Sequence, residues 1–372
     1  MKFSINKFQI VNVLAKVQGL TGRRSNLSIT ENILIRVEAG GIHLTATDLE
    51  TGFEGFYPAA VAEEGTVAVS SKKLFEIMRE FPSEDVLIHE IENRWIEIGQ
   101  DKVQYHIVGM NAEDFPETPH ITDVIFFPID ASILEKMIER TTIISAAGDE
   151  KRAHINGVLI ERIQEEDGCR LKFVSTDGSR LNAADYLFPI DQSVILNEGV
   201  LVPKKGLNEV AKFLDIEGPV QVGIKDNNFI VKKEMETIII RMLEGEFPKY
   251  EDILKKGNDH LISLNKIKFG KMLKRMSILA TDNYKGAVFT FNENKLVVTA
   301  TNPDYGESKE ETEIEFYGEP IEAAFNPKFF LDALSVIDEE NVILNIVDGS
   351  HPCVIEGNND KTFIGVIMPM RI

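Results

Sequence analysis

Three strand-like runs in this sequence each end in a threonine followed by a carboxylate or amide residue. The pairs are Thr47-Asp48, Thr176-Asp177 and Thr301-Asn302, and they recur about every 125–130 residues. Two aspartates at matching repeat positions have the right chemistry for catalytic carboxylates. However, residues that recur in an internal repeat usually have a structural role, and the third copy carries an amide. We therefore expect these side chains to cap a turn by hydrogen bonding.

Other residue types that do chemistry form no recognisable constellation. The sequence has no GxxxxGK[ST] phosphate loop, GxGxxG turn, HExxH zinc motif or GxSxG nucleophile elbow. Its seven histidines are scattered, and its two cysteines, Cys169 and Cys353, have no CxxC spacing. We therefore expect no catalytic residue, no metal and no cofactor. So few cysteines also favour a reducing, cytoplasmic setting.

The composition is that of a globular chain with several cores. The chain has 372 residues, of which 43% are hydrophobic. At this length, two or three domains are expected. No run of 18 apolar residues occurs and the N-terminus lacks a signal-peptide core, so we expect no membrane span and no secretion signal.

The elements around the repeated pairs also recur. Helical spacing or capping predicts helices at 7–20, 70–80, 131–145, 204–214, 265–279 and 327–336. Strand-like runs lie at 33–37, 42–47, 86–88, 95–98, 103–108, 157–162, 170–175, 220–224, 229–232, 237–242, 287–291, 295–300, 342–346, 353–356 and 362–368. The period is the length of a domain, since solenoid units run about 20–50 residues.

We predict three similar α+β domains, at 1–120, 127–250 and 259–372, with linkers near 117–127 and 251–260. Each would hold antiparallel strands with two helices on one face. Domains joined edge to edge would make a continuous sheet with two open outer edges. A head-to-tail contact between copies would cover those edges and close a ring.

The charge distribution separates one set of helices from the rest of the chain. A net charge of −20 by itself argues against nucleic acid. Yet segment 265–279 carries five cations and no acid, and segment 7–20 is also free of acid, whereas acid collects at 161–167 and 307–315. Salt screens charges beyond about 8 Å, so a basic surface can act independently of an acidic one. The alternative is that these charges are solvated helix faces.

The C-terminus is apolar to the last residue, whereas chain ends are usually polar. Segment 363–372 is either a final core strand or a tail beside a pocket. Pro369 ends the strand and leaves Met370 and Ile372 outside it, which favours a pocket with an adaptable methionine wall.

Six motifs together carry a resemblance to a known family. They are Thr45-Ala46-Thr47-Asp48-Leu49-Glu50, Asn156-Gly157-Val158, Thr176-Asp177-Gly178-Ser179-Arg180-Leu181, Val202-Pro203-Lys204-Lys205-Gly206, Gly245-Glu246-Phe247-Pro248-Lys249-Tyr250 and Met368-Pro369-Met370-Arg371. Over its whole length the chain resembles the bacterial DNA polymerase III beta subunit, the beta sliding clamp family.

The resemblance implies a DNA polymerase processivity factor and no enzyme. Two three-domain subunits would form a head-to-tail homodimeric ring with sheets outside and helices inside, around duplex DNA of any sequence. The ring would tether the replicative polymerase by raising its effective concentration. Further implied partners are the clamp loader and other proteins with a clamp-binding motif.

The resemblance also implies three sets of site residues. DNA-facing positions are Arg24, Lys73, His154, Lys204, Lys205, Lys271, Lys274 and Arg275. The partner-peptide pocket comprises Ile155, Thr176, Gly178, Arg180, Leu181, Pro248, Ile253, Val366, Met368, Pro369, Met370 and Arg371. The dimer interface comprises Lys102, Tyr105, Ile107, Ile278 and Leu279.

The chain departs from the family pattern at Ser179 and Asp252, which bear on partner preference, and at Ala153-His154, which bears on stacking against DNA. Two other functions stay open at this point. A three-domain enzyme acting on a nucleotide or sugar would need a convergent polar cleft. A structural assembly protein without a DNA role would not need helices that lack acidic residues.

Overall fold

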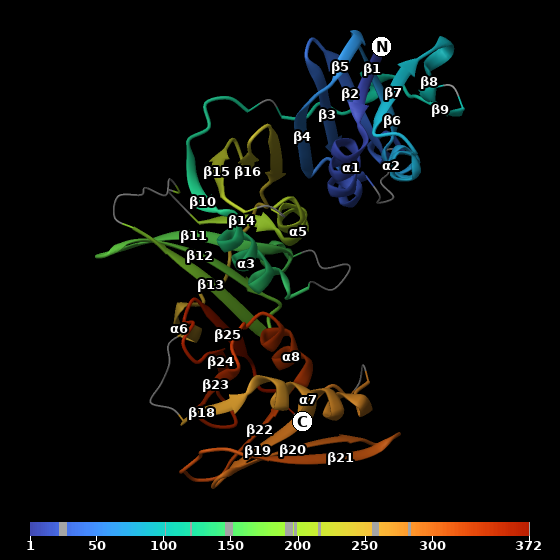
Figure 1. Cartoon of the computed structure of the whole chain (residues 1–372). Coiled ribbons are helices and arrows are strands. Elements are labelled where there is room, and N and C mark those ends of the chain that lie inside the picture. Colours follow the sequence, from blue (N-terminus) through green and yellow to red (C-terminus); the bar gives the residue numbers. More distant parts are fainter. Residues whose placement is uncertain are drawn as a thin grey trace. The chain divides into compact units, whose positions relative to one another are not determined.

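The computed structural model describes residues 1–21, 28–100, 102–119, 121–145, 152–189, 196, 199–214, 217–254, 260–281 and 284–371. The chain divides into two compact units, which are considered separately. Unit 1 comprises Met1–Glu135 and Lys205–Met242, and unit 2 comprises Lys136–Lys204 and Leu243–Ile372. Figure 1 colours the chain from its N-terminus to its C-terminus.

Unit 1 holds two antiparallel sheets. In the first, the strand order is β5 (Ala60–Glu63), β1 (Lys2–Asn6), β7 (Asp85–Glu90), β8 (Trp95–Gln100) and β9 (Val103–Val108). In the second it is β10 (Phe126–Asp130), β15 (Pro219–Lys225), β16 (Asn228–Lys233), β17 (Glu236–Arg241), β4 (Thr51–Pro58), β3 (Gly41–Thr47), β2 (Asn32–Glu38) and β6 (Gly65–Ser70). The second sheet therefore combines strands of the first and middle repeats.

Unit 2 also holds two antiparallel sheets. The larger has the order β14 (Val200–Pro203), β11 (Gly157–Glu165), β12 (Gly168–Thr176), β13 (Arg180–Phe188), β25 (Phe363–Ile367), β24 (Cys353–Gly357), β23 (Asn341–Ile346) and β18 (His260–Asn265). The smaller has the order β21 (Gly306–Glu313), β20 (Lys295–Asn302), β19 (Ala287–Asn292) and β22 (Ile321–Phe325). The larger sheet combines strands of the middle and third repeats.

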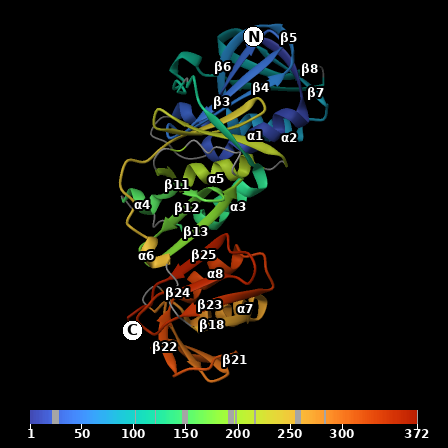
Figure 2. The same ribbon diagram turned by 90° about the vertical axis from the view of Figure 1, so that its left-hand side faces the viewer.

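The helices are α1 (Lys7–Thr21), α2 (Ser71–Glu80), α3 (Ala131–Thr142), α4 (Ala153–Asn156), α5 (Lys204–Phe213), α6 (Glu251–Leu254), α7 (Lys266–Met276) and α8 (Pro327–Ser335). Short 3-10 turns occupy η1 (Ser28–Glu31), η2 (Glu92–Arg94), η3 (Ala112–Asp114) and η4 (Ser277–Leu279). The six helices predicted from the sequence are confirmed within a few residues at each end. The helical turn α6 lies inside the second predicted linker. Figure 2 shows α7 and α8 beside the strands of the C-terminal repeat.

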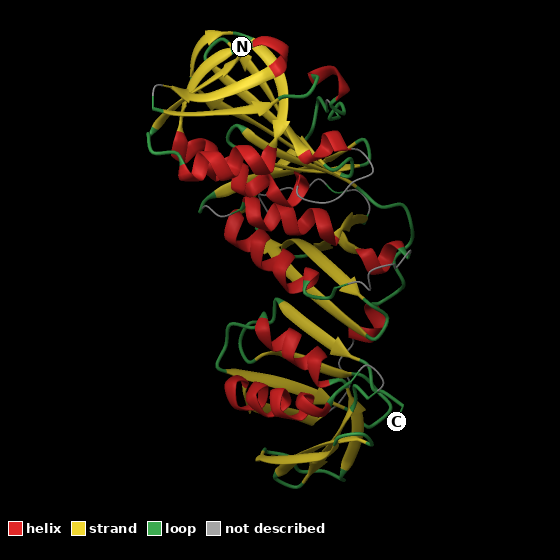
Figure 3. Cartoon of the chain, turned by 90° about the vertical axis from the view of Figure 1, so that its right-hand side faces the viewer, coloured by secondary structure: helices red, strands yellow, loops and turns green. Residues whose placement is uncertain are grey.

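Each repeat opens with a short strand that passes directly into a helix through a capping side chain. The strand–helix pairs are β1–α1, β10–α3 and β18–α7, capped by Asn6, Asp130 and Asn265. Each carboxylate or amide oxygen accepts a hydrogen bond from a backbone N–H of the first helical turn, as N-caps do. The helices α1, α3 and α7 thus start at equivalent places in the three repeats. All helices are drawn red in Figure 3.

The repeats join edge to edge, as predicted. In unit 1, β4 pairs with β17 from Thr51↔Ile240 to Gly55↔Glu236. In unit 2, β13 pairs with β25 from Arg180↔Ile367 to Ala184↔Phe363. The middle repeat therefore shares one sheet with each neighbour, which is why its residues are divided between the two units. The boundaries 1–120, 127–250 and 259–372 stay predictions.

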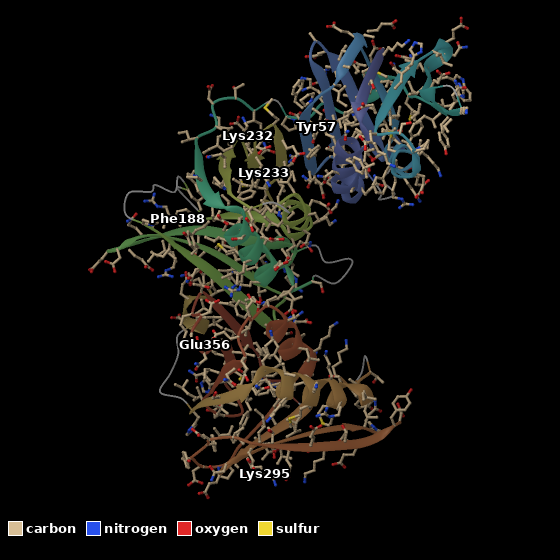
Figure 4. The ribbon with its side chains drawn as sticks, viewed as in Figure 1. Tyr57, Phe188, Lys232, Lys233, Lys295 and Glu356 are labelled. Atoms are coloured by element: carbon tan, nitrogen blue, oxygen red, sulfur yellow. The ribbon has the colours of Figure 1, made fainter. Side chains whose placement is uncertain are left out.

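The seam in unit 1 contains a buried polar cluster. The Tyr57 hydroxyl donates to Glu236 at 2.6 Å, and Lys16 reaches the other oxygen of that carboxylate at 3.3 Å. Burial and the neighbouring Glu236 raise the pKa of Tyr57, which stays a neutral donor. Tyr57 is labelled in Figure 4. The cluster fixes β4 against β17 because its members would be costly to bury apart.

Candidate functional site

The repeated Thr-Asp and Thr-Asn pairs cap turns, as predicted. Asp48 accepts from the backbone N–H groups of Glu50 and Thr51, at 3.1 and 2.8 Å. Asp177 does the same for Ser179 and Arg180, at 2.9 and 3.1 Å. In each carboxylate Oδ1 accepts from the backbone and Oδ2 faces a cation, Lys205 at Asp48 and Arg180 at Asp177, so both carboxylates serve structure.

The third pair follows the same pattern with an amide. Asn302 accepts from the backbone N–H of Asp304 at 3.0 Å and donates to the carbonyl of Leu279 at 2.7 Å. In the first two repeats the turn needs a left-handed residue, which is Leu49 at φ 77° and Gly178 at φ 88°. Glycine takes that conformation without the strain a side chain adds.

The seam between β13 and β25 carries an apolar floor. Leu181 pairs with Val366 across the seam, and both are buried. They belong to a cluster that also includes the buried residues Val174, Ala183, Tyr250 and Val354, with Leu159, Phe247, Leu254 and Ile364 packed against it. Ile155 is also buried. The structure thus brings Leu181 and Val366 together, as the peptide-pocket prediction requires.

The C-terminal tail leaves the sheet and stays anchored by backbone. The N–H of Met368 donates to the carbonyl of Ser179 at 2.9 Å, and that of Met370 donates to Ala324 at 2.7 Å. Both methionine side chains remain more than a third exposed. Pro369 is partly buried between them and Arg371 is exposed. Met368 is therefore held beside the seam, whereas Met370 and Arg371 line a hollow of about 320 Å³ with residues such as Tyr284 and Thr299 of the C-terminal repeat.

The remaining residues of the predicted pocket divide into exposed and buried groups. Pro248 and Ile253 are exposed, as are Gly178 and the departure residues Ser179 and Asp252. Thr176 is buried, and its hydroxyl donates to the carbonyl of Arg180 at 2.7 Å. Pro248, Ile253 and Gly178 are therefore accessible at the surface, whereas Thr176 holds the turn.

Arg180 does not project from the rim. Its side chain is only 6% exposed, and its Nε and Nη1 donate to Asp177 and Asp332 at 2.9 and 2.6 Å. Its guanidinium carbon lies 4.3 Å from the ring centroid of Phe329. A guanidinium held by two carboxylates and stacked on an aromatic ring is fixed in place. Arg371 is left as the exposed cation of the pocket set.

Lys204 was predicted to face DNA, and the structure shows that this prediction is wrong. Its side chain is buried, and its Nζ donates to the carbonyls of Ile155 and Thr176 at 2.7 and 3.4 Å. Burial lowers its pKa to about 8, although the nearby Asp177 opposes that shift. An ammonium turned inward onto two backbone carbonyls is not presented to DNA, so Lys204 instead holds the backbone at Ile155 and Thr176.

The other predicted DNA-facing residues differ in their local partners. Lys73 forms an ion pair with Glu76 at 2.9 Å, Lys205 lies against Asp48, and Arg275 donates to Glu310 at 2.7 Å. His154 is partly exposed, with its ring edge-on to Phe247. Arg24 lies outside the described residues.

Lys271 and Lys274 are the clearest candidates for contact with an anion. Both are exposed on α7, and within the described ranges neither forms an ion pair with a carboxylate. The helix has no acid in its first turn, and Lys274 and Arg275 lie in its last turn. A phosphate could therefore bind these two lysines without first breaking an ion pair.

Two strand edges have complementary character. In unit 1, β9 forms one edge of its sheet and exposes Tyr105 and Val108, with Ile107 partly buried and Lys102 exposed. In unit 2, β21 forms an edge of its sheet and is strongly acidic. Beside β21, a groove of about 570 Å³ is lined by the end of β18, by α7 and by β21. Ile278 is 75% exposed just beyond α7, and Leu279 is partly buried.

Within the described residues, no group of three or more His, Cys, Asp or Glu side chains is placed to hold a metal ion. In the same part of the chain, no helix is both long enough and apolar enough to cross a membrane. Both cysteines are buried, and burial raises the pKa of the Cys353 thiol to about 12.

Family models match the chain in three consecutive segments. The N-terminal, central and C-terminal domains of the DNA polymerase III beta subunit match residues 1–119, 128–249 and 251–371. The beta sliding clamps of Pseudomonas putida and Escherichia coli are each 29% identical to this chain, and each alignment covers both proteins completely.

Solved structures agree with these sequence matches. A sliding clamp from Bartonella birtlesii, bound to griselimycin, has a TM-score of 0.93 at 25% identity. The DNA polymerase III beta subunit of Pseudomonas aeruginosa has a TM-score of 0.90 at 28% identity. Both alignments cover 100% of each chain.

Proposed function

Because this chain belongs to the DNA polymerase III beta subunit family of sliding clamps, we propose that two copies close head to tail around duplex DNA and tether the replicative polymerase. The ring slides because its contacts with phosphate are electrostatic and independent of sequence. It is a scaffold that catalyses no reaction, and it works in the cytoplasm with the replication machinery.

The observation that carries this proposal is the pair of free sheet edges. An open edge invites pairing with another chain. The edge strand β9 exposes apolar Tyr105 and Val108, whereas β21 is acidic and lies beside the exposed Ile278. We propose that β9 of one copy pairs with β21 of the next, with Lys102 facing the acidic segment 307–315. An apolar centre with a charged rim is the usual anatomy of an interface.

We propose that the DNA-facing surface includes Lys73, His154, Lys205, Lys271, Lys274 and Arg275, and we omit Lys204 because it is buried. Lys271 and Lys274 form its centre because both are exposed and, within the described residues, neither is ion-paired, although Lys271 shares a groove with Glu310, Glu311 and Glu313. Lys205 and Arg275 would exchange a carboxylate partner for phosphate. Such contacts make binding weaken as salt is added.

We propose that partner proteins dock a short peptide at the seam of β13 and β25. The floor is apolar at Leu181 and Val366, and Met368 and Met370 form an adaptable wall. Two or three apolar anchors buried at about 25 cal/mol per Å² give modest affinity after the cost of ordering the peptide. Modest affinity suits partners that must exchange on one ring, such as the polymerase and the clamp loader.

A primer-extension assay tests the proposed function. The replicative polymerase of the same organism copies a primed circular template, with its clamp loader and ATP, in the presence or absence of this protein. The proposal predicts much longer products per binding event when the protein is present. Equal product lengths in both reactions contradict the tethering role.

The two other functions considered from the sequence receive less support. An enzyme acting on a nucleotide or sugar needs converging catalytic groups, and the repeated aspartates instead cap turns. A purely structural assembly role does not explain why a chain of net charge −20 exposes the cations Lys271 and Lys274 on one helix.

A further inference from the structure

Arg140, near the end of α3, is buried against a loop of the C-terminal repeat. Its side chain is 4% exposed, and its Nη2 lies 2.5 Å from Oδ2 of Asp360. Its Nη1 donates to the Thr362 hydroxyl at 2.8 Å. The loop at 358–362 joins β24 to β25. One guanidinium of the middle repeat therefore holds the loop that leads into β25.

The backbone at the same helix end holds the neighbouring strands. The carbonyl of Arg140 accepts a hydrogen bond from Asn182 at 2.8 Å, and the carbonyl of Thr141 accepts one from Ser175 at 2.6 Å. Asn182 lies on β13 and pairs with Gly365 of β25. The end of α3 thus contacts β12 and β13 through its carbonyls and the approach to β25 through its guanidinium.

Hydrogen bonds within the C-terminal repeat also hold the 358–362 loop in one conformation. Glu339 accepts from the backbone N–H groups of Asn359 and Asp360, at 2.9 and 2.7 Å. Asp360 in turn accepts from the N–H of Thr362 at 3.0 Å. Although burial opposes ionisation, hydrogen bonds from Thr362 and Arg140 lower the pKa of Asp360, which remains a carboxylate. The loop therefore presents a fixed anion to Arg140.

The contact lies close to the proposed peptide pocket along the chain. Phe363 starts β25 one residue after Thr362, and its ring centroid lies 5.5 Å from the Arg140 guanidinium carbon. Val366 of the apolar floor and Met368 of the tail follow within a few residues. Both positions follow Phe363 on the same strand and its tail, so a shift of β25 at its first residue would displace the backbone that carries them.

We propose that Arg140 is a positioning residue for the partner-peptide pocket: by fixing the 358–362 loop against α3, it sets the placement of β25 and of the tail that follows. Arg140 touches no peptide and acts through Asp360, Thr362 and Phe363. The proposal rests on the proposed docking of partner peptides at this seam.

The test uses the full-length protein with Arg140→Met, Arg140→Lys, Asp360→Asn and a matched control, Lys136→Met. Lys136 lies on the same helix, with its Nζ 2.9 Å from Asp338 and 3.6 Å from Asp360, but its side chain is 42% exposed. An exposed ion pair contributes little, so the control should change peptide binding less than about twofold.

Two measurements are made on each variant. Anisotropy of a labelled peptide from the C-terminal tail of the polymerase gives the affinity, and hydrogen exchange followed by mass spectrometry gives the protection of residues 363–370. We expect Arg140→Met to weaken the peptide about tenfold and to speed exchange of 363–370 by a similar factor. Arg140→Lys should recover part of both. Dimerisation and retention on DNA should stay at wild-type levels, which separates positioning from general destabilisation.

Asp360→Asn removes the anion without creating a large cavity, so it carries the test if Arg140→Met fails to fold. The two changes should be non-additive because they interrupt one contact. Wild-type peptide affinity and wild-type exchange in Asp360→Asn overturn the proposal. Joint loss of peptide binding, dimer and DNA retention also overturns it, since the role is then general stability. If the unmodified protein binds no peptide, the docking proposal fails, and exchange of 363–370 still reports whether Arg140 fixes β25.

Discussion

The buried ammonium of Lys204 makes stability depend on pH in a defined direction. Burial lowers its pKa from 10.5 to about 8 in the folded protein. Between these values the unfolded chain binds a proton that the folded chain does not, so the free energy of unfolding rises with pH. Below about pH 8 both states are protonated and the slope vanishes. Lys204 therefore makes the folded protein more stable as pH rises. An ion-paired lysine, whose pKa is raised by folding, does the opposite.

The magnitude follows from the size of the shift. Each pKa unit corresponds to about 1.4 kcal/mol, so the full effect is about 3 kcal/mol. The part gained between about pH 7.5 and about pH 9.5 is about 2 kcal/mol, from the same linkage relation. Both carbonyl contacts can persist throughout, because a neutral amine still donates to Ile155 and Thr176.

The assay is urea unfolding followed by circular dichroism over this pH range, for the wild type and for Lys204→Met. Subtracting one curve from the other removes every group that the two proteins share. Lys205→Met is the control, since Lys205 is the adjacent lysine and its side chain is 30% exposed. We expect the difference between wild type and Lys204→Met to shift by about 2 kcal/mol in favour of the wild type. A difference that is constant with pH refutes a buried ammonium.

Three further predictions concern the proposed surfaces. Changing Lys271 and Lys274 to Glu should reduce retention on DNA at least about tenfold at physiological salt, because fewer phosphates are then neutralised and fewer counterions leave the DNA on binding; a salt titration checks this, and an unchanged slope counts against it. Ile278→Ala with Leu279→Ala should yield monomers in sedimentation at low micromolar concentration, since Ile278 is exposed in the isolated chain; a persistent dimer would contradict the placement. Deleting Met368 to Ile372 should abolish binding of the polymerase-tail peptide in calorimetry and leave dimerisation intact, whereas full affinity would locate the pocket elsewhere.

The helices were predictable because their ends carry local signals. Asn265 accepts from the backbone of Lys268 at the start of α7, and Asn326 precedes Pro327 at the start of α8. Both arrangements are N-terminal signatures that a sequence displays directly. Phe81-Pro82 marks the end of α2 in the same way, because the residue before proline avoids helical backbone.

Several strands could not be predicted because their neighbours define them. The strands β1, β10 and β18 have only five or six residues, and Phe3 and Ile5 show how few buried positions carry the alternation in β1. Half of the residues of β21 are glutamates, so the strand resembles a loop in sequence, although it pairs with β20 along its length. In each case the ladder of hydrogen bonds to a distant segment overrides weak local preference.

The site was only partly predictable for a related reason. The repeat predicted that domains join edge to edge, and the resemblance pointed to Leu181 and Val366, which the structure pairs across the seam. The adjacent cations Lys204 and Lys205 look alike in sequence, yet successive residues on a helix point about 100° apart, so one is buried and the other reaches Asp48. Arg180 was predicted to line the peptide pocket and is instead held by Asp177 and Asp332, of which Asp332 is distant in the chain.

The central claim is that the protein holds DNA by encircling it. The most direct measurement loads the labelled protein onto nicked circular DNA with the clamp loader and ATP, then isolates the complex by gel filtration. Half of the complex is cut once with a restriction enzyme before a second filtration at the same salt. We predict that the protein stays with the circular DNA and is released from the linear DNA, because a ring slides off a free end. Equal retention on both forms would mean that it binds DNA by surface contact alone, and would contradict the account.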